Sequence, residues 1–199
     1  MKLYSAKNST FSRRVRLALH EKGLELEELE TPKEARAKEE YLALNPYGRI
    51  PCLLDGELAL YESSAILEYL ELLHPTPALV PAVPALRARC AMHVKLCDLE
   101  YTPYAIRIQR PKRLRPEPEW DREEFARCSE AVARHYEHLE RELMGKTYLV
   151  AERFTWADLA YLPFLHFHEL LEVPLPPNIA AWWERLRARE SARATEPSA

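Results

Sequence analysis

The chain has 199 residues, a formal net charge of −3 and a hydrophobic fraction of 47%, enough apolar material for one compact unit or two small domains. The weak net charge excludes a global attraction to nucleic acid or to anionic membranes, and we expect neither as a partner. No membrane-length apolar stretch or signal peptide is recognisable and the four cysteines lack CxxC spacing, which favours reduced thiols in the cytoplasm.

Short strands and helices alternate along the first part of the chain. The first helix is indicated by Val15, Ala18 and Leu19 on one face, and Gly23 is its C-terminal stop. Thr31 and Pro32 are typical of the start of a second helix. The first four elements, strand, helix, strand and helix, are predicted at residues 1–5, 13–22, 24–29 and 33–42.

A hairpin and a third helix are predicted next. Pro51 lacks a backbone N–H and therefore belongs at a strand start or edge. Asp55-Gly56, between two short apolar runs, is typical of a tight hairpin turn. Glu62 and Ser63 then open a helix whose apolar residues have helical spacing. The seven elements in this order predict a thioredoxin-like α/β domain.

A proline-rich linker and a helical second half are predicted after residue 75. Four closely spaced prolines mark the boundary, and helical patterns dominate beyond them. We expect an α/β domain at residues 1–75, a linker at 76–84 and an all-helical domain at 85–199. The final residues, 191–199, are expected to fray.

Arginine and histidine side chains on the predicted helices are expected to face solvent. Arg13, Arg14 and Arg16 are on the first helix, where we expect them at the surface. His135 and His138 share one face of a later helix, and without a third ligand they too are expected at the surface. No metal site is predicted.

Three stretches resemble one protein family. They are SRRVRLALHEKGL at 12–24, NPYGRIPCLLDGELALYESSAILEYLE at 45–71 and FTWADL at 154–159. Together they resemble the cytosolic glutathione transferases over nearly the whole chain. The resemblance implies a thioredoxin-like domain followed by an all-helical domain, glutathione as co-substrate, a small electrophile as second substrate, and a homodimer. In FTWADL, Thr155 and Asp158 also have the spacing of a capping box.

The resemblance implies a glutathione-binding set. Glu62 and Ser63 would hold the γ-glutamyl end, and Ile50, before a cis proline bond, would pair its backbone with the cysteinyl unit. Arg49 either pairs with a ligand carboxylate or is a solvated loop residue. Taken alone, Glu62 and Ser63 favour simple capping of the helix. Their position directly after an Ile-Pro strand and a hairpin favours ligand binding instead.

The resemblance also places a thiol-activating residue six positions before Val15, which is Ser9. Thr10 and Ser12 are neighbouring hydroxyls and remain second choices, and an ordinary N-cap is the alternative for Ser9. Lowering a thiol pKa by about two units takes roughly 2.7 kcal/mol. A hydrogen bond to a charged group supplies about 1.5–3 kcal/mol, so one serine hydroxyl at a helix start is sufficient.

Two functions are therefore expected from the sequence. The first is conjugation of glutathione to electrophilic small molecules, with Ser9 as hydrogen-bond donor to the thiolate. The second is a non-catalytic binding protein on the same fold, because the segment HPTPALVPAVPALRAR at 74–89 resembles the stringent starvation protein A branch. That branch binds RNA polymerase and lacks a hydroxyl in the Ser9 position, so Ser9 favours the enzyme.

Overall fold

The computed structural model describes residues 1–197, which cluster into two compact units. The first unit comprises residues 1–79 together with the residues from Glu190 onward, and the second comprises residues 80–189. The predicted fold class, an α/β layer plus a helical half, is confirmed. The domain limits at 75 and 85 stay a prediction, and the return of the chain to the first unit at Glu190 had no signal in the sequence.

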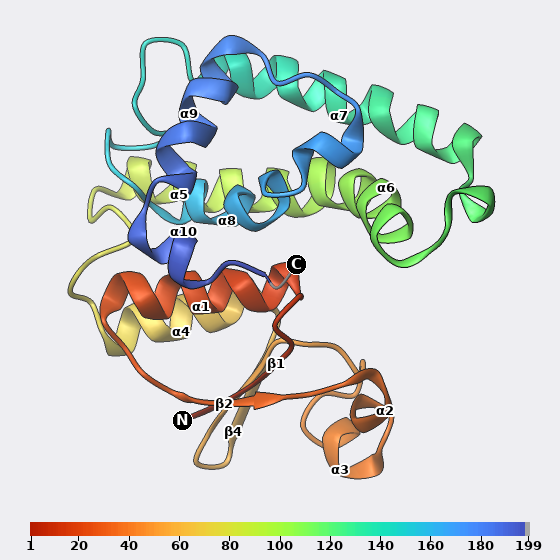
Figure 1. The fold of residues 1–199 in the computed structure, drawn as a ribbon. Coiled ribbons are helices and arrows are strands. Elements are labelled where there is room, and N and C mark those ends of the chain that lie inside the picture. The colour runs from red at the N-terminus through yellow and green to blue at the C-terminus, as the bar shows by residue number, and fades with distance from the viewer. Residues whose placement is uncertain (198–199) are drawn as a thin grey trace. The chain divides into compact units, whose positions relative to one another are not determined.

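A four-stranded sheet forms the centre of the first unit (Figure 1). Its strand order is β2-β1-β3-β4. The parallel pair is β1 with β2, and the two other pairs are antiparallel. The strands are β1 (Lys2–Ser5), β2 (Glu27–Glu30), β3 (Cys52–Asp55) and β4 (Leu58–Tyr61). The second strand therefore begins three residues later than predicted, and the Asp55-Gly56 hairpin is confirmed.

The helices of the first unit are α1 (Thr10–Lys22), α2 (Lys33–Arg36), α3 (Glu39–Leu42), α4 (Ser63–Leu73) and α10 (Glu190–Ala194). Gly23 closes α1 in the left-handed conformation at φ 63°, as predicted. The helix predicted at 33–42 is instead two single turns, because the backbone of Lys38 is extended between them.

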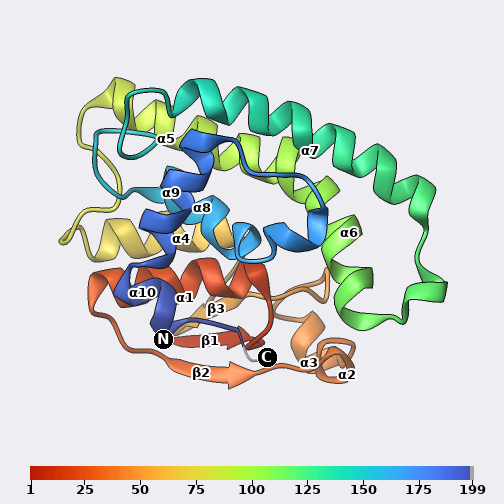
Figure 2. The same ribbon diagram turned by 45° about the horizontal axis from the view of Figure 1, so that its top comes forward.

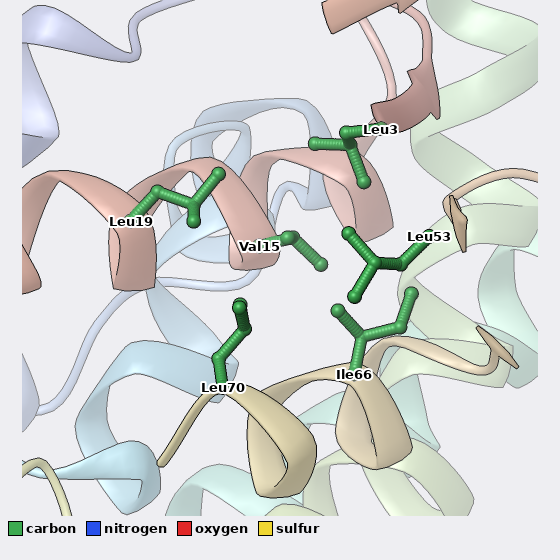
Figure 3. Packing of buried hydrophobic residues seen from close by; sticks show 6 residues of the cluster. All are labelled: Leu3, Val15, Leu19, Leu53, Ile66 and Leu70. Atoms are coloured by element: carbon green, nitrogen blue, oxygen red, sulfur yellow. The ribbon is translucent and has the colours of Figure 1, made fainter. Parts of the chain in front are cut away.

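The core of this unit lies between the sheet and the pair α1 and α4 (Figure 3). The sheet contributes side chains from β1 and β3, and the helices contribute one apolar stripe each. The six residues are Leu3, Val15, Leu19, Leu53, Ile66 and Leu70, and each is at most 7% exposed. Their burial packs α1 and α4 together, and the first turns of these helices supply Phe11 and Ser63 to the candidate site.

A buried ion pair closes the opposite end of these two helices. Lys22 Nζ lies 2.7 Å from Glu71 Oε2, and the same ammonium donates to the carbonyls of His74 and Pro77 at 2.7 and 2.9 Å. Glu71 in turn accepts from the backbone N–H of Leu79. The pair therefore ties α1 and α4 to the segment that leaves the unit.

The second unit is helical. Its elements are α5 (Pro84–Leu96), a π-turn (Cys97–Tyr101), α6 (Thr102–Leu114), a 3₁₀ turn (Glu117–Glu119), α7 (Arg122–Glu142), α8 (Trp156–Leu165), a second 3₁₀ turn (His168–Leu171) and α9 (Pro177–Arg187). Every residue of α8 is buried, and α8 contacts α5, α6 and α9 (Figure 2). It is the central helix of this unit.

The capping box predicted at the start of α8 is formed. Asp158 Oδ2 accepts from the backbone N–H of Thr155 at 2.9 Å and from its hydroxyl at 3.1 Å. The other oxygen, Oδ1, accepts from the N–H of Leu149 and from the indole of Trp182, both at 3.0 Å. Burial raises the pKa of Asp158 to about 6. The residue therefore joins three segments of the second unit rather than capping one helix.

Three surface expectations are wrong. Arg13 and Arg14 are 3% and 1% exposed, since the first donates to Ala192 O at 2.9 Å and the second lies over the ring of Phe11. His135 is 6% exposed because it stacks against aromatic rings in the helical core. The expected fraying does not apply to residues 191–194, which belong to α10 with Ser191 and Ala192 buried. Positions 198–199 lie outside the described residues.

Within residues 1–197, no helix combines the length and the apolar character that crossing a membrane requires. In the same part of the chain no group of three or more histidine, cysteine, aspartate or glutamate side chains is arranged to hold a metal ion. The four cysteines are free and buried.

Candidate functional site

A pocket of about 80 Å³ in the first unit gathers the residues that the resemblance implies for glutathione binding. Its lining is Phe11, Asn45, Arg49, Ile50, Pro51, Glu62 and Ser63. Liquid water occupies roughly 30 Å³ per molecule, so the pocket fits one polar end group and not a whole tripeptide. Four of the seven lining residues were predicted from the sequence to bind the ligand: Arg49, Ile50, Glu62 and Ser63. Phe11 and Asn45 were not predicted.

Asn45 shapes one wall of the pocket through the turn that it begins. Its side-chain amide donates to the Arg49 carbonyl at 2.8 Å, and its Oδ1 accepts from the N–H of Tyr47 at 3.1 Å. Gly48 sits at φ +58°, where a Cβ atom would also meet the Arg36 carbonyl at 3.2 Å. The carbonyl of Arg49 is thereby fixed, while its guanidinium remains exposed over the ring of Tyr47.

The next wall is the bend at Ile50 and Pro51. The Ile50-Pro51 peptide bond is cis, as the resemblance implies. β3 begins directly after it at Cys52, whose side chain is fully buried and whose pKa is raised by burial to about 11. A thiol with that pKa stays protonated at neutral pH, so Cys52 brings no protein nucleophile to the pocket.

Glu62 has an unusual backbone conformation at the start of α4. Its φ of 70° and ψ of 115° lie outside the regions that residues with a Cβ atom favour. Such a conformation costs on the order of 1–3 kcal/mol. The Glu62 side chain makes no capping hydrogen bond and is exposed, so capping does not offset that cost. Glu62 is instead one of the residues that line the pocket.

Ser63, the first residue of α4, is 5% exposed. Its hydroxyl lies 3.5 Å from Nη1 of the buried Arg14, and the Arg14 guanidinium is 5.1 Å from the ring centre of Phe11. The backbone N–H groups at the start of α4 and the positive end of its dipole point toward the same place. A buried guanidinium, a hydroxyl and a helix N-terminus together form a site for a carboxylate.

Ser9 caps α1, as the alternative interpretation requires. Its side-chain oxygen accepts the backbone N–H of Ser12 at 3.2 Å. A hydroxyl has two acceptor positions and one proton, so this bond leaves the proton available for a ligand. Ser9 is half-buried, it does not line the 80 Å³ pocket, and it lies two residues before Phe11, which does.

The neighbouring hydroxyls differ from Ser9 in exposure. Ser12 is fully buried and its oxygen has no hydrogen-bond partner. A ligand thiolate cannot contact a side chain without exposed surface. Among the two serines, Ser9 alone is accessible, and Thr10 is the remaining second choice.

Comparison with known proteins gives two family matches. Residues 3–78 match the glutathione S-transferase N-terminal domain, and residues 96–190 match the glutathione S-transferase C-terminal domain. The stringent starvation protein A homolog of Coxiella burnetii is 30% identical over 90% of this chain and 81% of its own length. Glutathione S-transferase 3 of Zea mays is 31% identical over 98% of this chain and 92% of its own.

Among solved structures, the theta class glutathione S-transferase from Xanthomonas axonopodis pv. citri with glutathione bound has a TM-score of 0.91. It is 26% identical and aligns with 100% of this chain and 97% of its own. Both halves of the sequence and the whole fold thus match glutathione S-transferases. The chain belongs to the glutathione S-transferase superfamily.

Proposed function

We propose that this protein binds glutathione with the γ-glutamyl end of the tripeptide in the 80 Å³ pocket, and that it conjugates the glutathione thiolate to electrophilic small molecules. The observation that carries the proposal is the convergence of four predicted glutathione-binding residues on that one pocket. The solved relative from Xanthomonas, with glutathione bound, supports the ligand.

The γ-glutamyl end of glutathione carries one ammonium and one carboxylate. The exposed carboxylate of Glu62 is suited to the ammonium, and the Ser63 hydroxyl with the α4 N-terminus is suited to the carboxylate. Ile50 would pair its backbone with the cysteinyl unit. Arg49, with its guanidinium exposed at the pocket, would pair with the second carboxylate. Each charged group of the tripeptide then has a partner of opposite charge or a hydrogen-bond donor.

The thiol of the bound tripeptide would lose its proton to water and be held as a thiolate by the Ser9 hydroxyl. The thiolate sulfur attacks an electrophilic carbon, a sulfur–carbon bond forms, and a leaving group departs with its electron pair. Ser9 acts only as a hydrogen-bond donor and forms no covalent bond. The protein is proposed to work as a homodimer in the cytoplasm.

A second candidate is a non-catalytic protein that acts on transcription through RNA polymerase. The relative from Coxiella, a stringent starvation protein A homolog, favours it. The two candidates differ at the thiol, because only an enzyme needs a hydroxyl that stabilises a thiolate. The half-buried Ser9 hydroxyl, which accepts from Ser12 and keeps its proton for a ligand, supports the enzyme.

The test combines binding and turnover. Calorimetry should show glutathione binding that weakens by about 1–3 kcal/mol in Ser63→Ala. Turnover with a chloronitrobenzene and with other electrophiles should fall in Ser9→Ala at neutral pH and recover as the pH rises, whereas Ser9→Thr, which keeps the hydroxyl, should retain most of it.

Two outcomes would count against the proposal. Absence of turnover with every electrophile would favour the partner-binding protein. Turnover whose pH profile is the same in Ser9→Ala as in wild type would move the thiolate role to Thr10. Native mass spectrometry would report the oligomeric state.

A further inference from the structure

We infer that Arg16 is a positioning residue for Ser9: its guanidinium locks the turn at residues 6–9 that presents the Ser9 hydroxyl. This inference rests on the thiolate role proposed for Ser9. The Arg16 side chain is 12% exposed, although it lies on the α1 face where the sequence suggested a surface residue. Three different groups hold it there, and two of them belong to the turn.

The guanidinium bridges two consecutive carbonyls of the turn. Nη2 donates to Lys7 O at 2.7 Å, and Nη1 donates to Ala6 O at 3.3 Å. The same Ala6 carbonyl accepts the backbone N–H of Ser9 at 2.9 Å. The hydrogen bond that closes the turn at Ser9 and the hydrogen bond from Arg16 therefore share the Ala6 carbonyl as acceptor. If the guanidinium is displaced, this carbonyl can move, and the backbone of Ser9 moves with it.

The strand β2 anchors the other side of the guanidinium. Nη1 of Arg16 lies 3.0 Å from Glu28 Oε1, which also accepts from the hydroxyl of Ser5 at the end of β1. Glu30 Oε2 accepts from the backbone N–H of Lys7 at 3.1 Å. Both carboxylates come from one edge strand and both hold the segment that leads to Ser9. Arginine suits this task because its planar fork donates in several fixed directions, which a lysine ammonium cannot reproduce.

Packing does not explain this arrangement. Beyond the guanidinium lies a pocket of about 360 Å³, lined by Lys7, Arg16, Glu28, Glu30 and residues 194–196. Removing the guanidinium therefore leaves no closed cavity, and we expect Arg16 variants to fold. What they lose is the constraint on the turn, and hence the direction of the Ser9 hydroxyl.

The experiment measures the pKa of the thiol of glutathione bound to the full chain, from the ultraviolet absorbance of the thiolate during a pH titration. Arg16→Gln should raise that pKa by about one unit, from ~6.5 to ~7.5, which lowers the thiolate fraction at pH 7 about threefold. At about pH 5.5, where the bound thiol is protonated in both proteins, the affinity for glutathione should stay within about twofold, because Arg16 does not line the 80 Å³ pocket. At neutral pH, turnover at saturating glutathione should fall with the thiolate fraction.

Arg16→Lys separates positioning from charge. It keeps the positive charge but not the fork, so positioning predicts a thiol pKa close to that of Arg16→Gln. If the bound thiol in Arg16→Lys has the same pKa as in the wild type, the positive charge alone stabilises the thiolate, and the inference is overturned. The matched control is Lys2→Gln, which breaks an exposed pair between β1 and β2 (Lys2 to Glu27, 3.3 Å) without touching the turn and should leave the thiol pKa unchanged.

A double variant tests whether Arg16 acts through Ser9. Ser9→Ala with Arg16→Gln should give the thiol pKa of Ser9→Ala alone, because nothing remains to be positioned. Additive shifts would overturn the inference and leave the role of Ser9 intact. If Ser9→Ala itself leaves the thiol pKa unchanged, the proposed function fails first, so the two failures are distinguishable.

Discussion

At the residue scale, Glu62 has a strained backbone at the proposed glutathione-binding site. Its left-handed backbone is costly for a side chain with a Cβ atom, and no capping bond offsets that cost. A glycine would adopt φ 70° without strain. The carboxylate at this position therefore does not serve helix capping, and the proposed function gives it a role in binding the ammonium of glutathione.

We predict opposite effects of Glu62→Gly on stability and on binding. Relief of the backbone strain should raise the free energy of unfolding by up to about 1 kcal/mol, so the variant should unfold at a higher urea concentration. The binding free energy for glutathione should weaken by about 1–3 kcal/mol, because the charged acceptor is lost. Glu62→Gln is the matched control, since it keeps the strain and removes only the charge. A loss of stability in Glu62→Gly would show that the carboxylate supports the fold.

At the scale of elements, the sequence predicts helix ends and turns that depend on neighbouring residues. It does not predict contacts between residues far apart in the chain. Gly23, the Asp55-Gly56 turn and the Thr155 box involve residues at most a few positions apart, so each leaves a pattern in the sequence. Arg14 reaches Ser63 across 49 positions, and Arg13 reaches Ala192 across 179. Such pairs depend on the packing of α1 against α4 and α10, and no periodicity records them.

The Lys22–Glu71 pair is the strongest test of that packing. Lys22→Met should destabilise the protein by about 3–5 kcal/mol, because it leaves a buried carboxylate without its cation. Lys2→Met, at an exposed pair, should cost less than about 1 kcal/mol. Urea unfolding measures both, and equal effects in the two variants would mean that the Lys22 pair is no stronger than a surface pair.

At the scale of the whole molecule, buried histidines set the response to acid. Burial lowers the pKa of His93 and of His135 to about 4. Both nitrogens of His93 lack a hydrogen-bond partner, and its nearest carboxylate oxygen, on Glu142, is 3.8 Å away. An unfolded histidine has a pKa near 6.5, so the unfolded chain binds more protons between about pH 4 and pH 6.5 and stability must rise with pH there.

Asp158 opposes this trend, because its raised pKa of about 6 makes the folded chain bind the extra proton. His93 and His135 outweigh one aspartate, and His168, whose pKa burial also lowers, acts in the same direction. The free energy of unfolding should therefore increase by at least roughly 1.4 kcal/mol per pH unit across the window. His135→Phe keeps an aromatic ring beside Tyr101 and Tyr161 and should reduce the slope by about the same amount. Urea midpoints across the window provide the test, and an unchanged slope would contradict it.

The most direct test of the central claim is the pKa of glutathione's thiol when the tripeptide is bound to the wild-type protein. The account predicts a value about two units below the ordinary thiol pKa of ~8.5, and a return toward ~8.5 in Ser9→Ala with glutathione still bound. A bound thiol that titrates near ~8.5 in the wild type would contradict the account, because the protein would then hold glutathione without activating it.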